Sequence, residues 1–418
     1  MHRDRFGVST PRFYGVRADV MIEGRQSVAE SDRWSHRGMA VTALCFLLNM
    51  CDGVNIFTLT YVAPVLQREF SASTGHFGVV FSAGLLGMAI GGLGLAPLAD
   101  RFGRRPLILF ALTLMAGAMF ASACAPGVWS LAADRVAVGV GIGTVLASIT
   151  ALSAGFAPDR WRHVAAGLPQ AGYPVGATLA GFVTAWALPR YHWQGIFVGA
   201  GAVTLLFLPL CLWALPEAAD RRLTGHLTLA QALGGRRKRN SQLLWLCSIC
   251  GFMALYFIAS WITRLAIAAG LPPTQAIIAS AVYNLGACAG TIAISVAARS
   301  IDLRKLVFGS LLSASGLFLV FGGVRMGLAP LLFVSFLIGI TLQGGVNANY
   351  PLVASAYPAE ARATGLGWAM GVGRIGAMLG PLVGGFAIGE GLPLVAVFGI
   401  FCVPMLVTGV AALWIRFD

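Results

Sequence analysis

The feature that most constrains this chain is a series of apolar runs, each roughly 20 residues long, separated by short polar breaks. A helix of that length spans the hydrocarbon core of a bilayer and satisfies its backbone hydrogen bonds internally. Strands of a membrane barrel would be only about 10 residues long and would alternate in polarity, which these runs do not. Only 11% of the residues are charged, too few to cover a soluble surface. The sequence therefore predicts an all-α, multi-pass membrane protein.

We expect about 12 transmembrane helices by the length criterion. Their expected centres are Met50, Met88, Met115, Gly141, Val175, Ala202, Met253, Cys288, Ser313, Gly339, Arg374 and Met405. Alternate loops are rich in lysine and arginine, such as "DRFGRR" and "RSIDLRK", and the loops between them are poor in both. Because excess lysine and arginine mark the cytoplasmic side, both termini are predicted to be cytoplasmic.

The longest loop divides the chain into two similar halves. We predict a disordered cytoplasmic tail over residues 1–37, six-helix halves over 38–215 and 241–418, and a cytoplasmic linker over 216–240. Met21 is an alternative start to Met1. A shift of 200 positions aligns Gly139 with Gly339, Pro158 with Pro358, Arg162 with Arg362, Gly167 with Gly367 and Gly176 with Gly376. Parallel repeats of this kind build transporters whose substrate site lies at the midplane between the halves.

Several function classes fit poorly. The net charge of +13 lies in short loops between spans, so membrane topology explains it better than nucleic-acid binding does. Cys247 and Cys250 form a CxxC pair without a second pair or nearby histidines, so no metal site is expected. The sequence offers no nucleophile–base pair of the kind that an enzyme would need, so an enzyme is not expected. No cofactor is expected either. A non-transporting ligand sensor would need a signalling domain, which the short mid-chain loop does not provide.

The loop "APLADRFGRRPLILF" resembles the cytoplasmic signature loop of the major facilitator superfamily, G-x-L-A-D-R-x-G-R-R. The matching residues are Asp100, Arg101, Gly103, Arg104 and Arg105, whereas the leading glycine is Ala96 here. In that family the loop helps to control the switch between outward-open and inward-open states. The alternative is a plain positively charged cytoplasmic loop.

Two arginines lie inside predicted spans. Arg135 is followed by Gly139 and Gly143, as in the superfamily's fourth span. A buried arginine needs a partner, and a carboxylate on another helix or a substrate is favoured over the adjacent Asp134. The alternative is an arginine that reaches the membrane interface. Arg374 lies roughly 18 Å along its helix from Arg362, near the midplane, which favours substrate binding or gating over a structural pair.

Longer motifs resemble the aromatic acid:proton symporters of this superfamily. The branch patterns match "DGVN…AP" (Asp52–Pro64), "GYPVGA" (Gly172–Ala177) and "WAMGVGRIG" (Trp368–Gly376). The resemblance implies an inner-membrane importer that carries a small aromatic carboxylate with protons by alternating access, as a monomer. Alternatives are a facilitator, symporter or exporter of another small organic anion.

Asp52 lies roughly 21 Å along its helix from Gly38, again near the midplane, and is the candidate proton-coupling residue. Burial favours the neutral form of a carboxyl, and a nearby arginine favours the charged form. The branch has a second acid where Asn55 stands here, on the same helix face as Asp52. An amide cannot carry a proton in this pH range, so coupling would use Asp52 alone or be lost. The alternative is a fixed structural pair of Asp52 with Arg135.

The remaining candidates would form the substrate site. Arg374 is expected to bind the carboxylate, and Arg135 is the second choice. Asn55, Asn347, Gln343, Asn284 and Tyr256 could bind ring hydroxyls, and Trp368 is expected near the same cavity or in helix packing.

Overall fold

The computed structural model describes residues 35–95, 98–157, 165, 167–215, 237–298, 300–357 and 362–415, although not every side chain within them. Within these ranges every regular element is a helix. Most of the predicted tail and linker lie outside the described residues, as do the predicted repeat positions Pro158, Arg162 and Pro358.

Eleven helices in the described ranges are long and apolar enough to cross a membrane. They are built on α2 (His36–Glu69), α3 (Thr74–Ile90), α5 (Arg104–Ala123), α6 (Val128–Gly155), α9 (Trp193–Ala214), α11 (Arg237–Ala268), α12 (Pro273–Ala297), α13 (Leu303–Gly323), α14 (Leu328–Ile338), α17 (Arg362–Gly389) and α18 (Leu394–Leu413). The predicted fifth span is the shorter α8 (Gly172–Ala187), preceded by the 3₁₀ turn η4 (Leu168–Ala171).

Short elements complete the spans. The π-helix η1 (Gly91–Leu95) extends α3, and η5 (Gly339–Gln343), α15 (Gly344–Asn347) and α16 (Asn349–Ala356) extend α14. The short helix α4 (Ala99–Phe102) precedes α5. Every predicted span centre lies in one of these elements, so the predicted helical membrane fold is confirmed.

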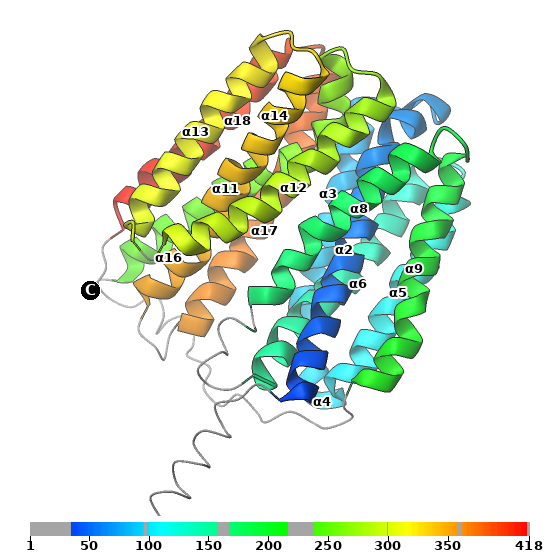
Figure 1. Ribbon diagram of the computed structural model, residues 1–418, viewed down its shortest axis with the longest axis vertical. Helices are drawn as coiled ribbons and strands as arrows, with labels where there is room; N and C mark the ends of the chain where they lie inside the picture. Colours follow the sequence, from blue (N-terminus) through cyan, green and yellow to red (C-terminus); the bar gives the residue numbers. More distant parts are fainter. Residues whose placement is uncertain are drawn as a thin grey trace, which may run out of the picture.

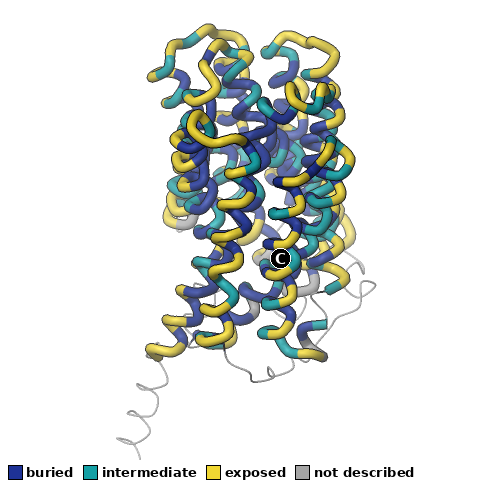
Figure 2. The backbone as a smooth tube through the Cα atoms, turned by 90° about the vertical axis from the view of Figure 1, so that its right-hand side faces the viewer, coloured by how far each residue is buried: buried dark blue, intermediate teal, exposed yellow. Residues whose placement is uncertain are grey.

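The helices form two bundles side by side, α2 to α9 in one and α11 to α18 in the other (Figure 1). Exposed positions follow the outer turns of the helices (Figure 2). Many of them carry large apolar side chains, such as Leu206, Trp213 and Phe333. An apolar outer surface is what a bundle surrounded by lipid requires.

The internal repeat is visible in how glycines let helices approach. A Cβ on Gly176 of α8 would overlap the carbonyl oxygen of Met50 on α2, and one on Gly376 of α17 would overlap that of Ile249 on α11. Likewise Gly139 lies against the Gly84 carbonyl and Gly339 against the Tyr283 carbonyl. The aligned glycines therefore make the same helix contact in each half, which confirms the predicted pseudo-repeat.

We expect Gly176→Ala to lower the melting temperature of the purified protein in detergent. The added methyl group meets backbone rather than a movable side chain, and overpacking of this kind costs about 1–3 kcal/mol. The matched control is Gly199→Ala on α9, where a Cβ would meet nothing within 4 Å. Equal melting temperatures for the two variants, measured by thermal unfolding, would contradict this packing argument.

Hydrogen bonds join the two halves toward one end of the bundle. Ser82 of α3 donates to the Met378 carbonyl of α17 at 2.7 Å, and Thr60 of α2 donates to the Ala259 carbonyl of α11 at 3.3 Å. Beside them, Phe81 of α3 packs edge-on against Trp261 of α11. These contacts lie toward the end that carries the loops at 70–73 and 390–393, and α4 and α16 lie at the other end (Figure 1).

Candidate functional site

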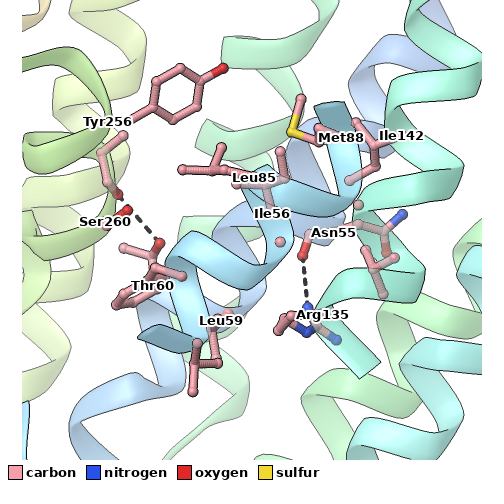
Figure 3. Close-up of a pocket in the computed structure, with 16 residues that line it drawn as sticks. Asn55, Ile56, Leu59, Thr60, Leu85, Met88, Arg135, Ile142, Tyr256 and Ser260 are labelled. Carbon is pink, nitrogen blue, oxygen red and sulfur yellow. Dashed lines mark hydrogen bonds between the residues drawn. The ribbon is translucent and has the colours of Figure 1, made fainter. Parts of the chain in front are cut away.

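A cavity lies between the two halves, where α2, α3 and α6 of the first half face α11 of the second. The space among the lining side chains, counted together with the part that is open to solvent, is about 490 Å³. Its lining is mostly apolar and includes Ile56, Leu59, Val80, Phe81, Leu85, Met88, Val138 and Ile142. Polar side chains line two opposite parts of it, with Arg135 and Asn55 in one and Tyr256, Ser260 and Thr60 in the other (Figure 3).

Arg135 of α6 is buried, so it does not reach the membrane interface. Its Nη2 donates to the Ser122 hydroxyl at 2.6 Å, and its Nη1 lies 3.5 Å from the Asn55 carbonyl oxygen. The guanidinium also lies 5.2 Å from the ring centre of Phe197. The expected carboxylate partner on another helix is not found among the described residues. A hydroxyl, a backbone carbonyl and an aromatic ring contact the guanidinium, and the carboxylate within its electrostatic range is that of the adjacent Asp134.

Arg374 lies near the middle of α17 and is only partly buried. Its Nη1 lies 3.1 Å from the hydroxyl of Tyr256, which lines the cavity. The hydroxyls of Tyr350 and Tyr173 are also within electrostatic range of the guanidinium. Among the described residues Arg374 has no carboxylate partner, so its positive charge is free to meet an anion.

Asp52 is buried in the middle of α2. Neither carboxyl oxygen has a hydrogen-bond partner among the described residues. The alternative of a fixed pair with Arg135 is therefore wrong for this conformation. Asp52 does not line the cavity, but the hydroxyl of Tyr173 on α8 is within electrostatic range of both Asp52 and Arg374.

Asn55 is held on the side of α9. Its amide nitrogen donates to the Thr204 hydroxyl at 2.9 Å and lies 3.6 Å from the sulfur of Cys51. The Thr204 hydroxyl lies 3.2 Å from the Asn55 side-chain oxygen and 2.9 Å from the Ala200 carbonyl oxygen. The amide is thus engaged within its own half, although Asn55 also lines the cavity.

Other predicted substrate residues lie away from this cavity. Gln343 donates to Asn347, and Asn347 donates to Thr291 on α12 at 2.8 Å. Asn284 donates to the Ser280 carbonyl of its own helix. Trp368 is largely exposed, 6.2 Å from the ring of Trp245. None of the four lines the described cavity. Gln343 and Asn347 are held by neighbours within the second half, and Asn284 also interacts with the hydroxyl of Tyr61 on α2.

The signature loop contains the turn that its glycine predicts. Gly103 has φ +88° between α4 and α5, a conformation that residues with a Cβ rarely adopt. Arg105 donates to the Leu212 carbonyl at the end of α9, and Arg104 is half-buried. The side chains of Asp100 and Arg101 lie outside the described set, so their predicted gating role stays a prediction.

Two tyrosines within electrostatic range of Arg374 were not among the residues predicted from the sequence. Tyr173 and Tyr350 lie in spans where any aromatic residue reads as packing, although the "GYP" motif was a signal for Tyr173. Ser122, Thr204 and Ser260 carried no signal, because small hydroxyl residues are common in membrane helices. No cluster able to hold a metal ion occurs among the described residues.

The family model of the Major Facilitator Superfamily matches residues 45–306 and again 244–418. The chain belongs to this superfamily. It is a membrane transporter and not an enzyme.

Curated relatives of this superfamily member are named as aromatic acid transporters. The 3-(3-hydroxy-phenyl)propionate transporter of Escherichia coli is 31% identical, covering 90% of this chain and 94% of the relative. The gallate transporter of Pseudomonas putida is 29% identical, with 89% and 90% covered. The 4-hydroxybenzoate transporter PcaK of Pseudomonas putida is 28% identical, with 88% and 90% covered. The resemblance to the aromatic acid branch is thereby confirmed.

Solved structures share the fold of this superfamily member. A bacterial homologue of the human lysosomal transporter Spinster, described as inward-facing and occupied, has a TM-score of 0.71 over 89% of this chain and 94% of its own, at 16% identity. The xylose transporter XylE of E. coli, described as inward open, also has a TM-score of 0.71, over 90% and 96%, at 15% identity.

Proposed function

We propose that this protein imports a small aromatic carboxylate together with protons by alternating access. The observation that carries the proposal is the cavity between the halves. The lining is mostly apolar, the buried cation Arg135 lies at one part of it, and Arg374, which is hydrogen-bonded to Tyr256, lies beside the opposite part. The relatives named as transporters of gallate, 4-hydroxybenzoate and 3-(3-hydroxyphenyl)propionate support an aromatic acid as the substrate.

The lining suits a substrate with one charged end and one flat apolar ring. Phe81, Leu85 and Met88 offer apolar contact to the ring, and Ser260 and Tyr256 offer hydroxyls to the polar end of the substrate that meets Arg374. We assign the carboxylate to Arg374 rather than Arg135. Arg135 already donates to Ser122 and to the Asn55 carbonyl, whereas Arg374 has a single described hydrogen bond and is more exposed. A guanidinium binds a carboxylate best when two of its N–H groups are available.

Asp52 is the proposed proton carrier. An unpaired carboxylate in the middle of a membrane helix is costly, so the neutral, protonated form suits the surroundings of Asp52 in this conformation. Release of the proton would then need a conformation in which water or a cation reaches the carboxyl group. That requirement links proton release to the conformational change.

The contacts between the halves suit one state of an alternating-access cycle. Ser82, Thr60 and the Phe81–Trp261 pair hold the halves together toward the end with the loops at 70–73 and 390–393. With the basic loops cytoplasmic, that end faces the outside and both termini face the cytoplasm. This arrangement is an inward-facing state in the cell's inner membrane, like the states named for the two solved relatives in fold.

Uptake by cells that express the protein tests this function. We would supply radiolabelled 4-hydroxybenzoate, gallate and 3-(3-hydroxyphenyl)propionate with and without a protonophore, against cells carrying the empty vector. We expect accumulation of at least one acid above its external concentration, and its loss with protonophore. Uptake that only equilibrates and ignores the protonophore would identify a facilitator. No uptake of any of the three would overturn the substrate class.

A further inference from the structure

The transmembrane helices contain few acidic residues that could carry a proton. In the helices that the structure describes as spans, the acidic side chains are Asp52 and Glu69 of α2 and Asp134 of α6. Glu69 is the last residue of α2, and its carboxylate accepts from the indole N–H of Trp193. Asp134 lies near the beginning of α6, is partly exposed and is next to Arg135. Asp52 is therefore the one acid in this set that lies deep inside a span.

The groups around Asp52 do not add a second proton carrier. Those on neighbouring elements are Tyr173, Arg135 and Cys211, with Cys51 and Tyr61 on α2 itself. Tyr256, Tyr283 and Arg374 lie beyond Tyr173, within electrostatic range of its hydroxyl. Phenols and thiols keep their protons near neutral pH, and arginine keeps its charge.

Asn55 lies one helical turn from Asp52 and is where a second acid would fit. Its side chain is buried and bonded to Thr204, so it already occupies the space of a carboxylate of the same size. An amide neither binds nor releases a proton in this pH range. Asn55 thus limits the number of acids in this part of the membrane to one.

From this count we propose that transport is electroneutral, with one proton carried per monoanionic aromatic acid, and that Asn55 sets that ratio. The inference rests on the proposed function of proton-coupled uptake. One negative charge on the carboxylate and one proton on Asp52 cancel, so no net charge crosses the membrane in a cycle. A pH gradient then drives accumulation and a membrane potential does not, because the potential acts only on net charge moved.

The test uses the full-length protein in liposomes, with labelled 4-hydroxybenzoate, gallate and 3-(3-hydroxyphenyl)propionate as probes. Valinomycin with equal potassium on both sides clamps the potential at zero while an acidic exterior supplies the pH gradient. Valinomycin with potassium only inside supplies an inside-negative potential without a pH gradient. We expect accumulation in the first condition, and no added uptake from the potential in the second.

Asn55→Asp is the decisive variant. A second acid beside Asp52 would allow a second proton per cycle, so an inside-negative potential should now stimulate uptake. Asn55→Ala, which removes the amide without adding an acid, is the matched control, and the transport that it retains should be as insensitive to the potential as that of the wild type. Failure of Asn55→Asp to respond to the potential, with transport retained, would contradict the role of Asn55.

The wild-type result decides the stoichiometry even if Asn55→Asp does not fold. Stimulation of wild-type uptake by an inside-negative potential would overturn the one-proton ratio and leave the proposed function standing. Inhibition by that potential, with no response to the pH gradient, would identify an anion facilitator and overturn both. Absence of transport for every probe would likewise overturn the inference together with the substrate class.

Discussion

Replacement of Asp52 by asparagine is expected to abolish accumulation of the aromatic acid, reducing proton-driven uptake to that of liposomes without protein. Asparagine has the size of aspartate but cannot carry a proton. Since the carboxyl oxygens of Asp52 have no hydrogen-bond partner among the described residues, the change breaks no described bond. We therefore expect the variant to fold and to keep exchanging labelled for unlabelled acid. Accumulation under a pH gradient and exchange at equal pH measure the two properties separately.

Asp302→Asn is the matched control for this experiment. Asp302 caps α13 outside the spans by accepting from the backbone N–H of Arg304 at 2.9 Å, and asparagine caps a helix about as well. Its ion pair with Arg304 is exposed, so its loss costs little. The control should accumulate acid like the wild type. If Asp52→Asn accumulates acid just as well, Asp52 is a structural residue and protons are coupled elsewhere.

The helices and the repeat could be predicted because their signals are local. An apolar run of about 20 residues identifies a span without knowledge of its neighbours. Glycines such as Gly176 and Gly376 recur at one offset because each half repeats the same helix contact. Gly103 likewise predicts its own turn, since a positive φ depends on a single residue.

The site could be predicted only in part, because its partners are far apart along the chain. Arg374 and Tyr256 were each singled out, yet 118 positions separate them and no sequence pattern pairs them. Asn55 and Thr204 are 149 positions apart. For Arg135 a carboxylate on another helix or a substrate was favoured over the adjacent Asp134, but Asp134 is the acid that attracts it, and a hydroxyl from α5 and an aromatic ring from α9 meet its guanidinium. Gln343, Asn347 and Asn284 lie outside the described cavity, and the sequence alone does not show which polar residues of a helix bundle share one cavity.

The arginine that binds the carboxylate can be identified by comparing Arg374→Ala with Arg374→Lys. Truncating one partner of a buried charge pair costs about 2–5 kcal/mol, so Arg374→Ala should raise the KM for the aromatic acid about 30-fold or more. Lysine keeps the charge but lacks the planar guanidinium that contacts a carboxylate at two points. Arg374→Lys should therefore raise the KM less than Arg374→Ala does. Initial uptake rates over a range of acid concentrations give the KM of each variant.

Arg325→Ala is the control that separates this loss from a general effect of positive charge. Arg325 is exposed in the loop between α13 and α14, far along the chain from the residues that line the cavity. The KM of Arg325→Ala for the aromatic acid should match that of the wild type. The assignment of the carboxylate to Arg374 would fail if Arg374→Ala kept the wild-type KM while Arg135→Ala raised it. In that case the substrate would lie the other way round, with its ring substituents toward Tyr256 and its carboxylate beside Ser122 and Phe197.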